Sequence, residues 1–184
     1  MNYFGKIFRL TAFGESGGVI DGVPAGMRID TDAVQAQLDR RRPGQSVLTT
    51  ARNEADRVEF LSGFLDGVTL GSPIGFIIRN TDHRSADYSA MVDIYRPNHA
   101  DYTYEAKYGI REVRGGGRAS ARATASFVVA GAIARQALET LGIEISSEVK
   151  SVGGVSGGIS EMEAAIAAAK SDGDSVGGIV ECRV

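Results

Sequence analysis

The sequence predicts an α+β fold, because segments typical of antiparallel strands alternate irregularly with segments typical of helices. Apolar runs at 58–65 and 74–78 are separated by turn-forming residues, which predicts an antiparallel pair of strands. Residues 120–141 have a helical pattern whose first two-thirds is almost entirely small and apolar. Such a composition is typical of a helix buried on every side, so we expect antiparallel strands packed around a buried central helix.

The remaining elements are predicted from turn and capping residues. Asp30 suits the N-cap of a helix that runs through Leu38 and stops at 43–44, which is Pro-Gly. Residues 80–98 are polar and lack a clean period, which predicts a long surface connection. The other expected elements are a strand at 1–13 leading into a glycine-rich loop at 14–18, a strand at 143–149, a helix at 161–170 and a strand at 176–184. We expect these elements to form a single domain, 1–184.

The composition is that of a globular protein without a general attraction to polyanions. The chain is 43% hydrophobic and 23% charged and has a formal net charge of -3, so nucleic acid and anionic membranes are not expected partners. The apolar run Ala123–Ala134 is shorter than the roughly 20 residues that a membrane span needs. Residues 1–10 lack the apolar stretch of a signal peptide. Because Cys182 is the single cysteine, we expect no disulfide and a cytoplasmic location.

Two groups of arginines are candidates for anion binding. The segment Arg114–Arg122 places three glycines, a serine and three arginines at the start of a predicted helix, where free backbone N–H groups attract phosphate. It lacks the Gly-Lys-Ser/Thr ending of a nucleotide-binding P-loop. The predicted helix that begins at Asp30 ends in three arginines, Arg40, Arg41 and Arg42. At this end they could equally complement the helix dipole on a solvated face. Arginine binds carboxylates and phosphates bidentately, so the expected ligand is a small polyanion.

His99 is the stronger candidate of the two histidines for acid–base chemistry. It lies three residues after Arg96 and two before Asp101, whereas His83 has no comparable setting. Histidine exchanges protons readily near neutral pH, although an ordinary loop role remains the alternative. No His-Glu-x-x-His motif or cysteine pair accompanies it, so we expect no metal site.

Six motifs, taken together and in order, resemble those of the chorismate synthase family. They are Phe13–Ser16, Asp21–Gly26, Asp39–Gly44, Leu61–Gly63, Arg96–Tyr104 and Arg114–Arg122. The resemblance covers essentially this whole chain but only about half of the family's length. It implies a β-α-β sandwich, a homotetramer and a lyase of the shikimate pathway of aromatic amino acid biosynthesis. The implied reaction is the anti-1,4-elimination of phosphate from 5-enolpyruvylshikimate 3-phosphate, which requires reduced FMN (FMNH2) and gives chorismate.

The resemblance also implies a role for particular residues. His99 matches the family histidine thought to protonate the reduced flavin. The implied substrate-binding residues are Ser16, Arg41, Arg42, Arg96 and Arg122. The implied FMN-binding residues are Arg118, Ala119 and Ser120. Arg41 also falls on a position assigned to NADP, with NADPH as reductant of the flavin, although the second arginine of that contact is Val47 here.

The sequence departs from the family pattern in two internal places. The family has a histidine after its Gly-Glu-Ser triplet, which acts as an acid toward the leaving phosphate, but Gly17 follows Ser16 here. The segment 151–161 is also shorter than in the family. Two alternatives to the enzyme therefore stay open: an inactive anion-binding fragment, and an RNA-binding domain that uses Arg40–Arg42.

Overall fold

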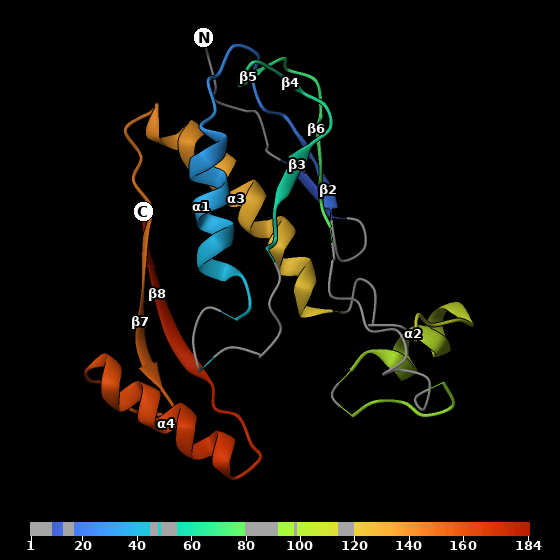
Figure 1. The fold of residues 1–184 in the computed structure, drawn as a ribbon, viewed down its shortest axis with the longest axis vertical. Coiled ribbons are helices and arrows are strands. Elements are labelled where there is room, and N and C mark those ends of the chain that lie inside the picture. The colour runs from blue at the N-terminus through green and yellow to red at the C-terminus, as the bar shows by residue number, and fades with distance from the viewer. Residues whose placement is uncertain are drawn as a thin grey trace. The chain divides into compact units, whose positions relative to one another are not determined.

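A sheet of antiparallel strands organises the larger part of the fold. The computed structural model describes residues 9–12, 17–44, 48, 55–79, 92–97, 99–113 and 120–184. Among these, a four-stranded sheet has the order β1 (Arg9–Ala12), β2 (Gly17–Asp21), β6 (Ile74–Ile78), β3 (Val58–Phe60). Figure 1 labels β2, β6 and β3 of this sheet. Every neighbouring pair is antiparallel. Together with the helices, this sheet confirms the predicted α+β class.

The core side of the sheet is set by the alternation of side chains along β6. Ile74, Phe76 and Ile78 are fully buried, whereas the two residues between them are partly exposed. Successive side chains of a strand point to opposite faces, so one face of the sheet forms the core. β3 and β6 are the antiparallel pair that the sequence predicted, paired from Val58↔Ile78 to Phe60↔Phe76.

The predicted strand at 58–65 is interrupted because Gly63 forces a turn. β3 ends at Phe60, and a short hairpin of β4 (Phe64–Leu65) and β5 (Val68–Thr69) follows. Gly63 has φ +83°, and a Cβ at this position would lie 2.7 Å from a side-chain carbon of Ile74. Only glycine fits both this backbone conformation and this approach. The expectation of one continuous strand over 58–65 is therefore wrong.

Gly17 and Gly18 belong to a strand and not to the expected glycine-rich loop. They begin β2 and pair with Ile77 and Phe76. Both are buried, and the hydroxyl of Ser126 donates a hydrogen bond to the Gly17 carbonyl oxygen at 3.0 Å. These glycines therefore bring the sheet backbone next to a helix. Residues 13–16, including Ser16, lie outside the described residues.

Two helices accompany this sheet. α1 (Thr31–Arg41) begins at Asp30, whose carboxylate accepts hydrogen bonds from the N–H groups of Asp32 and Ala33, as the sequence predicted. A 3₁₀ turn, η3 (Ala121–Ala123), leads into α3 (Thr124–Glu139).

The long helix α3 is buried on one side. Its buried residues are Ala125, Ser126, Val129, Ala132, Ile133 and Ala137. Phe127, in contrast, is 57% exposed, and Gly131 and Arg135 are exposed on the same stripe four and eight residues later. The expectation of burial on every side therefore does not hold along this stripe.

The last part of the chain forms a strand–helix–strand unit. β7 (Ser146–Val152) pairs antiparallel with β8 (Gly178–Arg183), with an irregularity between Val149 and Ser151. α4 (Ile159–Ser171) lies beside β7 in Figure 1. The strand, helix and strand predicted for this region are confirmed, with bounds that differ by a few residues.

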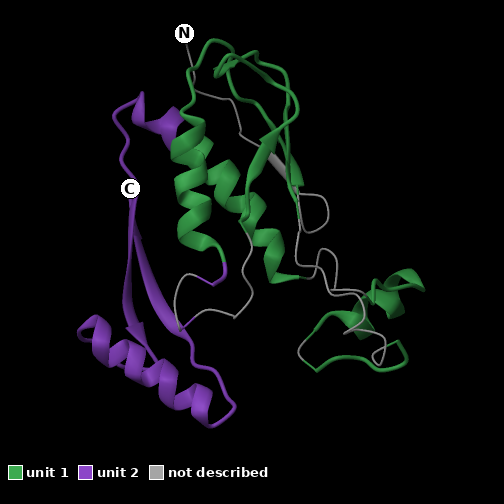
Figure 2. Ribbon diagram, viewed as in Figure 1, with its two compact units in different colours: residues 1–42, 52–134 green, residues 43–51, 135–184 purple. Residues whose placement is uncertain are grey.

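The chain divides into two compact units, which Figure 2 colours separately. The first contains residues 1–42 and 52–134, and the second contains residues 43–51 and 135–184. The single domain 1–184 remains a prediction. Within the first unit, 92–113 holds one helix, α2 (Asp101–Tyr108), which ends at Gly109 with φ +72°. Of the expected long connection, 80–91 and 98 lie outside the described residues.

A membrane-spanning helix is not found in the part of the chain that the structure describes: each of its helices is too short or too polar to cross a bilayer.

Candidate active site

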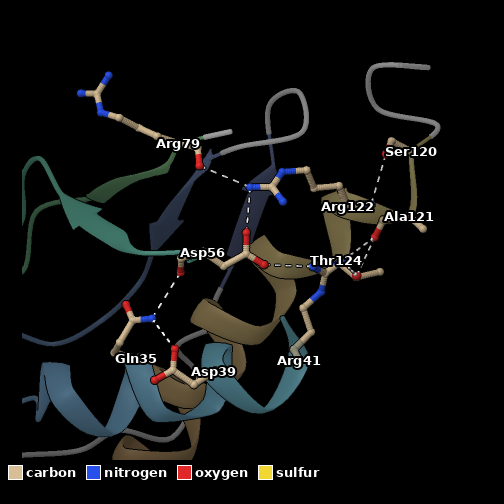
Figure 3. A network of polar contacts seen from close by, with 9 residues as sticks. All are labelled: Gln35, Asp39, Arg41, Asp56, Arg79, Ser120, Ala121, Arg122 and Thr124. Atoms are coloured by element: carbon tan, nitrogen blue, oxygen red, sulfur yellow. Dashed lines mark hydrogen bonds and ion pairs between the residues drawn. The ribbon is translucent and has the colours of Figure 1, made fainter. Parts of the chain in front are cut away.

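A buried aspartate, Asp56, joins two of the arginines that the sequence singled out. Its side chain is 0% exposed, and Nη1 of Arg41 lies 3.3 Å from its Oδ2. Nη2 of Arg122 lies 2.8 Å from its Oδ1, an ion pair without the alignment of a hydrogen bond. Figure 3 shows the three side chains meeting from the last turn of α1, the segment before β3 and the turn η3. We call Arg41, Asp56 and Arg122 the Asp56 cluster.

The Asp56 cluster carries one more positive than negative charge. A lone buried carboxylate would be costly, and two arginines compensate this one. The excess charge remains within reach of solvent, because the side chain of Arg41 is 24% exposed and that of Arg122 is 10% exposed. A small anion could therefore reach the exposed parts of the two guanidinium groups.

Backbone carbonyl oxygens and one hydroxyl oxygen fix the directions of both guanidinium groups. Nη2 of Arg41 donates to the carbonyl oxygen of Ala121 and to Oγ1 of Thr124, each at 3.1 Å. Nη2 of Arg122 donates to the carbonyl oxygen of Arg79 at 3.4 Å. Because these acceptors come from the helix start and from the end of β6, the cluster links α1, α3 and the sheet (Figure 3).

The backbone of Asp56 is held in an unusual conformation. Its φ is +43°, in the left-handed region, which aspartate tolerates better than most residues but which still costs about 1–3 kcal/mol. Gln35 of α1 fastens this segment from both sides. Its amide nitrogen donates to the carbonyl oxygen of Asp56 at 3.3 Å, and its amide oxygen accepts from the Val58 N–H at 3.1 Å.

Ser120 acts as a cap in the described structure. Its hydroxyl oxygen accepts from the backbone N–H of Arg122 at 3.2 Å, and Ser120 precedes the 3₁₀ turn as its N-cap. This bond ties the predicted FMN-binding segment to a member of the Asp56 cluster. Arg118 and Ala119, the other two predicted FMN-binding residues, lie outside the described residues.

A second buried aspartate, Asp101, organises residues 92–113. Nε and Nη2 of Arg96 each lie 2.8 Å from one oxygen of its carboxylate, and the Arg96 N–H donates at 3.0 Å. Nη1 of Arg111 lies 3.2 Å from the same carboxylate. The hydrogen bonds from Arg96 hold the pKa of Asp101 well below its usual range, although burial opposes this shift.

Arg111 completes this second group. Its Nε lies 3.1 Å from Oε2 of Glu105, and it donates to the carbonyl oxygens of Val92 and Ile94. Its guanidinium also lies 4.8 Å from the centre of the Tyr95 ring. We call Arg96, Asp101, Glu105 and Arg111 the Asp101 cluster. Its two positive and two negative charges balance.

His99 and Arg42 occupy exposed or half-exposed positions at helix ends. His99 is exposed, and its backbone N–H donates to the Arg96 carbonyl oxygen at 3.3 Å, just before α2. Arg42 is the C-cap of α1, with its N–H donating to the Leu38 carbonyl oxygen at 2.8 Å. In the described residues, His, Cys, Asp and Glu do not gather in a group of three or more that could hold a metal ion.

The structure thus brings together Arg41 and Arg122 and places Arg96 and His99 in one short segment. Sequence reasoning missed Asp56 and Arg111. Arg111 could have been found, since it stands only ten residues after Asp101. Asp56 gave no comparable signal, because neither of its arginines is near it in the sequence.

The sequence and the fold match proteins of one family. The family described as chorismate synthase matches residues 8–184. A chorismate synthase from Christiangramia forsetii is 51% identical over 209 residues, covering 98% of this chain and 58% of that protein. One from Bacteroides thetaiotaomicron is 59% identical over 159 residues, covering 84% of this chain and 44% of that protein.

A solved structure, "Crystal Structure of Chorismate Synthase", matches the fold with a TM-score of 0.68 at 26% identity. The match covers 96% of this chain and 57% of that one, and it confirms the fold that the resemblance implied. This chain spans less than two-thirds of the relatives' length. The 209 positions matched in the Christiangramia protein exceed the 184 residues here, so internal segments of the relative have no counterpart, as the sequence departures indicated.

Proposed function

This chain belongs to the chorismate synthase family, and from that premise we propose that it forms the N-terminal part of a carbon–oxygen lyase. The proposed reaction removes phosphate from 5-enolpyruvylshikimate 3-phosphate and gives chorismate, in the shikimate pathway of aromatic amino acid biosynthesis. The observation that carries the proposal is the meeting of Arg41 and Arg122 on Asp56. Both arginines were assigned to the substrate from sequence motifs far apart in the chain.

The charge of the Asp56 cluster suits the proposed substrate. That substrate carries one phosphate and two carboxylates, so a closed site needs several arginines to compensate for lost hydration. The cluster has one positive charge in excess and a partly exposed guanidinium on Arg41. In this proposal Arg41 and Arg122 bind one anionic group, while Ser16, Arg42 and Arg96 supply further contacts to the others.

Reduced FMN would supply the electron chemistry of the elimination when it is bound. The residues present fit its phosphate in charge, because Ser120 is hydrogen-bonded to the Arg122 backbone beside the excess positive charge. We propose that Arg118, Ala119 and Ser120 hold the flavin and that His99 protonates it. The exposed position of His99 leaves its imidazole accessible to a partner. Arg41 is the proposed contact for NADPH as reductant.

The rival functions make different demands on the arginines. An RNA-binding domain would use Arg40–Arg42 as a free basic surface. Arg41 instead points into the Asp56 cluster, and the chain has a net charge of -3, which both disfavour this reading. An anion-binding fragment without turnover would keep the arginines but lack the histidine that acts as an acid toward the leaving phosphate. The feature behind this alternative is that Gly17 follows Ser16 directly, without the histidine that the family has after this triplet. The family match over residues 8–184 favours the enzyme.

The decisive experiment is a titration of the chain with 5-enolpyruvylshikimate 3-phosphate, with FMN under reducing conditions, followed by an assay for chorismate. We expect substrate binding, a spectral change of the flavin, and loss of both in Arg122→Gln. Arg135→Gln is the matched control, because it removes the same charge from an exposed site on α3. Binding without chorismate would support the fragment. Salt-sensitive RNA binding without substrate binding would contradict the proposal.

The family assignment also suggests an oligomeric state and a cellular compartment. We propose a homotetramer in the cytoplasm, consistent with a free cysteine, Cys182, that is exposed. Light scattering after size-exclusion chromatography would give the mass directly. A mass of one copy at concentrations above those of the activity assay would contradict the tetramer.

A further inference from the structure

We propose that Asp56 is a positioning residue of the substrate site. Its carboxylate holds the guanidinium groups of Arg41 and Arg122 at one separation, so that both can contact the same anionic group. The inference rests on the proposed function, since it assumes that these two arginines meet the substrate. It adds to that function a residue outside the six family motifs that carried the resemblance.

The first argument is the geometry of the two ion pairs. Each arginine uses a different carboxylate oxygen, Oδ2 for Arg41 and Oδ1 for Arg122. Two guanidinium groups repel each other at short range, and each has a long side chain with many rotamers. A fully buried acid between them overcomes the repulsion and removes that freedom before any ligand arrives.

The second argument is that the protein holds Asp56 itself rigidly and at some cost. The residue is in the left-handed region at φ +43°. The side chain of Gln35 is hydrogen-bonded to the carbonyl oxygen of Asp56 and to the N–H of Val58. A strained backbone persists where its surroundings determine it, and such positions gather at functional sites. A surface ion pair such as Arg79–Glu59 shows neither burial nor strain.

Electrostatics and positioning predict opposite results when the charge of Asp56 is removed. The carboxylate repels an anionic ligand, so removing it would strengthen anion binding if charge alone mattered. If Asp56 positions the arginines, removing it would weaken binding, because the two groups would separate and adopt other rotamers. The sign of the change in affinity therefore distinguishes the two roles.

The test variant is Asp56→Asn. Asparagine has the shape of aspartate and also tolerates a positive φ, so it changes the charge with little backbone strain. We expect the Kd for 5-enolpyruvylshikimate 3-phosphate to rise about tenfold, as on loss of other outer positioning groups. Glu59→Gln is the matched control: it removes one negative charge from the exposed pair with Arg79 and should leave the Kd within about twofold. An unchanged or lower Kd in Asp56→Asn would overturn the proposal.

A second variant keeps the proposal testable if Asp56→Asn does not fold. Gln35→Ala leaves all three charges of the Asp56 cluster in place but removes the bonds that fasten the segment 56–58 to α1. We expect a smaller loss of affinity, about threefold, in protein that circular dichroism shows to be folded. Unchanged affinity in the folded variant would count against Asp56 as a positioning residue.

A measurement without ligand separates this inference from the proposed function. If the unmodified chain binds no substrate, the proposed function fails, but the contact between Asp56 and Arg41 can still be measured. Asp56→Asn, Arg41→Gln and the double variant form a cycle of unfolding constants. If the effects of the two substitutions on the unfolding constant depart from independence by at least about fivefold, the contact between Asp56 and Arg41 is formed before any ligand binds. Effects that multiply independently, within about twofold, would overturn it.

Discussion

The Asp56 cluster and the Asp101 cluster both compensate the charge of a buried aspartate, but they use different parts of the chain. In each, a buried carboxylate lies between two arginines. The Asp101 cluster takes all its members from residues 96–111, and Glu105 balances its charge. The Asp56 cluster joins α1, the segment before β3 and the turn η3, and its own three side chains sum to one positive charge. The Asp101 cluster therefore stabilises a local segment, whereas the Asp56 cluster joins elements that are distant in the sequence and is the proposed site for an anion.

This difference also sorts the arginines that the sequence nominated. Arg96 forms a bidentate pair with Asp101, so its guanidinium already has a carboxylate partner inside its own segment. Arg41 and Arg122 share one carboxylate. Because Arg41 and Arg122 come from distant elements and meet at one carboxylate, they are the stronger candidates for holding a substrate anion, while Arg96 remains a predicted contact.

The largest effect is expected from removing the acid that joins distant elements. Asp56→Ala leaves Arg41 and Arg122 without their carboxylate and places alanine at φ +43°, so we expect a loss of about 3–5 kcal/mol in the free energy of unfolding. Urea denaturation followed by circular dichroism measures it. Asp56→Asn should lose clearly less, and equal losses in the two variants would show that backbone strain contributes little.

The corresponding change in the second cluster should act locally. Asp101→Asn removes the negative charge that pairs with both Arg96 and Arg111. The ion pairs at the first residue of α2 therefore weaken, while the strand pairing of the sheet is unchanged. We expect the amide protons of α2 to exchange about tenfold or more faster, with little change at Val129 or Ile133 of α3. Equal acceleration in α2 and α3 would show that the two regions unfold together.

The sequence predicted the elements whose causes are local. Asp30 caps the helix that it was expected to cap, and the strands 58–60 and 74–78 pair as expected. The break at Gly63 depends on Ile74, which lies beside it only in the folded chain. A glycine pair at 17–18 suggests a loop, but its pairing with Ile77 and Phe76 places it in a strand, and these partners are even more distant in the sequence.

The candidate site follows the same division. Family motifs identified Arg41 and Arg122 one at a time, because motif residues stand in fixed local patterns. Their meeting on Asp56 depends on how α1 and α3 pack, and no spacing in the sequence encodes that distance. Asp101 was noted beside His99 and Arg96, but its second partner, Arg111, follows only once α2 has turned the chain back.

The Asp101 cluster should also make the stability of the chain depend on pH. The folded-state pKa of Asp101 is lowered, mainly by hydrogen bonds from Arg96, below the roughly 3.9 of an unfolded chain. The ionised carboxylate therefore contributes stability above about pH 4, and this contribution decreases as the pH falls below that value toward the folded-state pKa. The difference in stability between the unmodified chain and Asp101→Asn should be constant near neutral pH and shrink in acid. A difference independent of pH would contradict the pairing.

The smallest effect is expected where Ser120 caps the turn that carries Arg122. Ser120→Ala removes the oxygen that accepts from the Arg122 N–H, so we expect a loss of about 1 kcal/mol in the free energy of unfolding. Ser120→Asp restores a capping oxygen and should recover most of this stability, but its negative charge should still weaken binding of the FMN phosphate. Flavin titration and urea denaturation of both variants distinguish the two roles. If Ser120→Asp binds FMN as tightly as the unmodified chain, Ser120 serves the Asp56 cluster as a cap and does not contact the flavin.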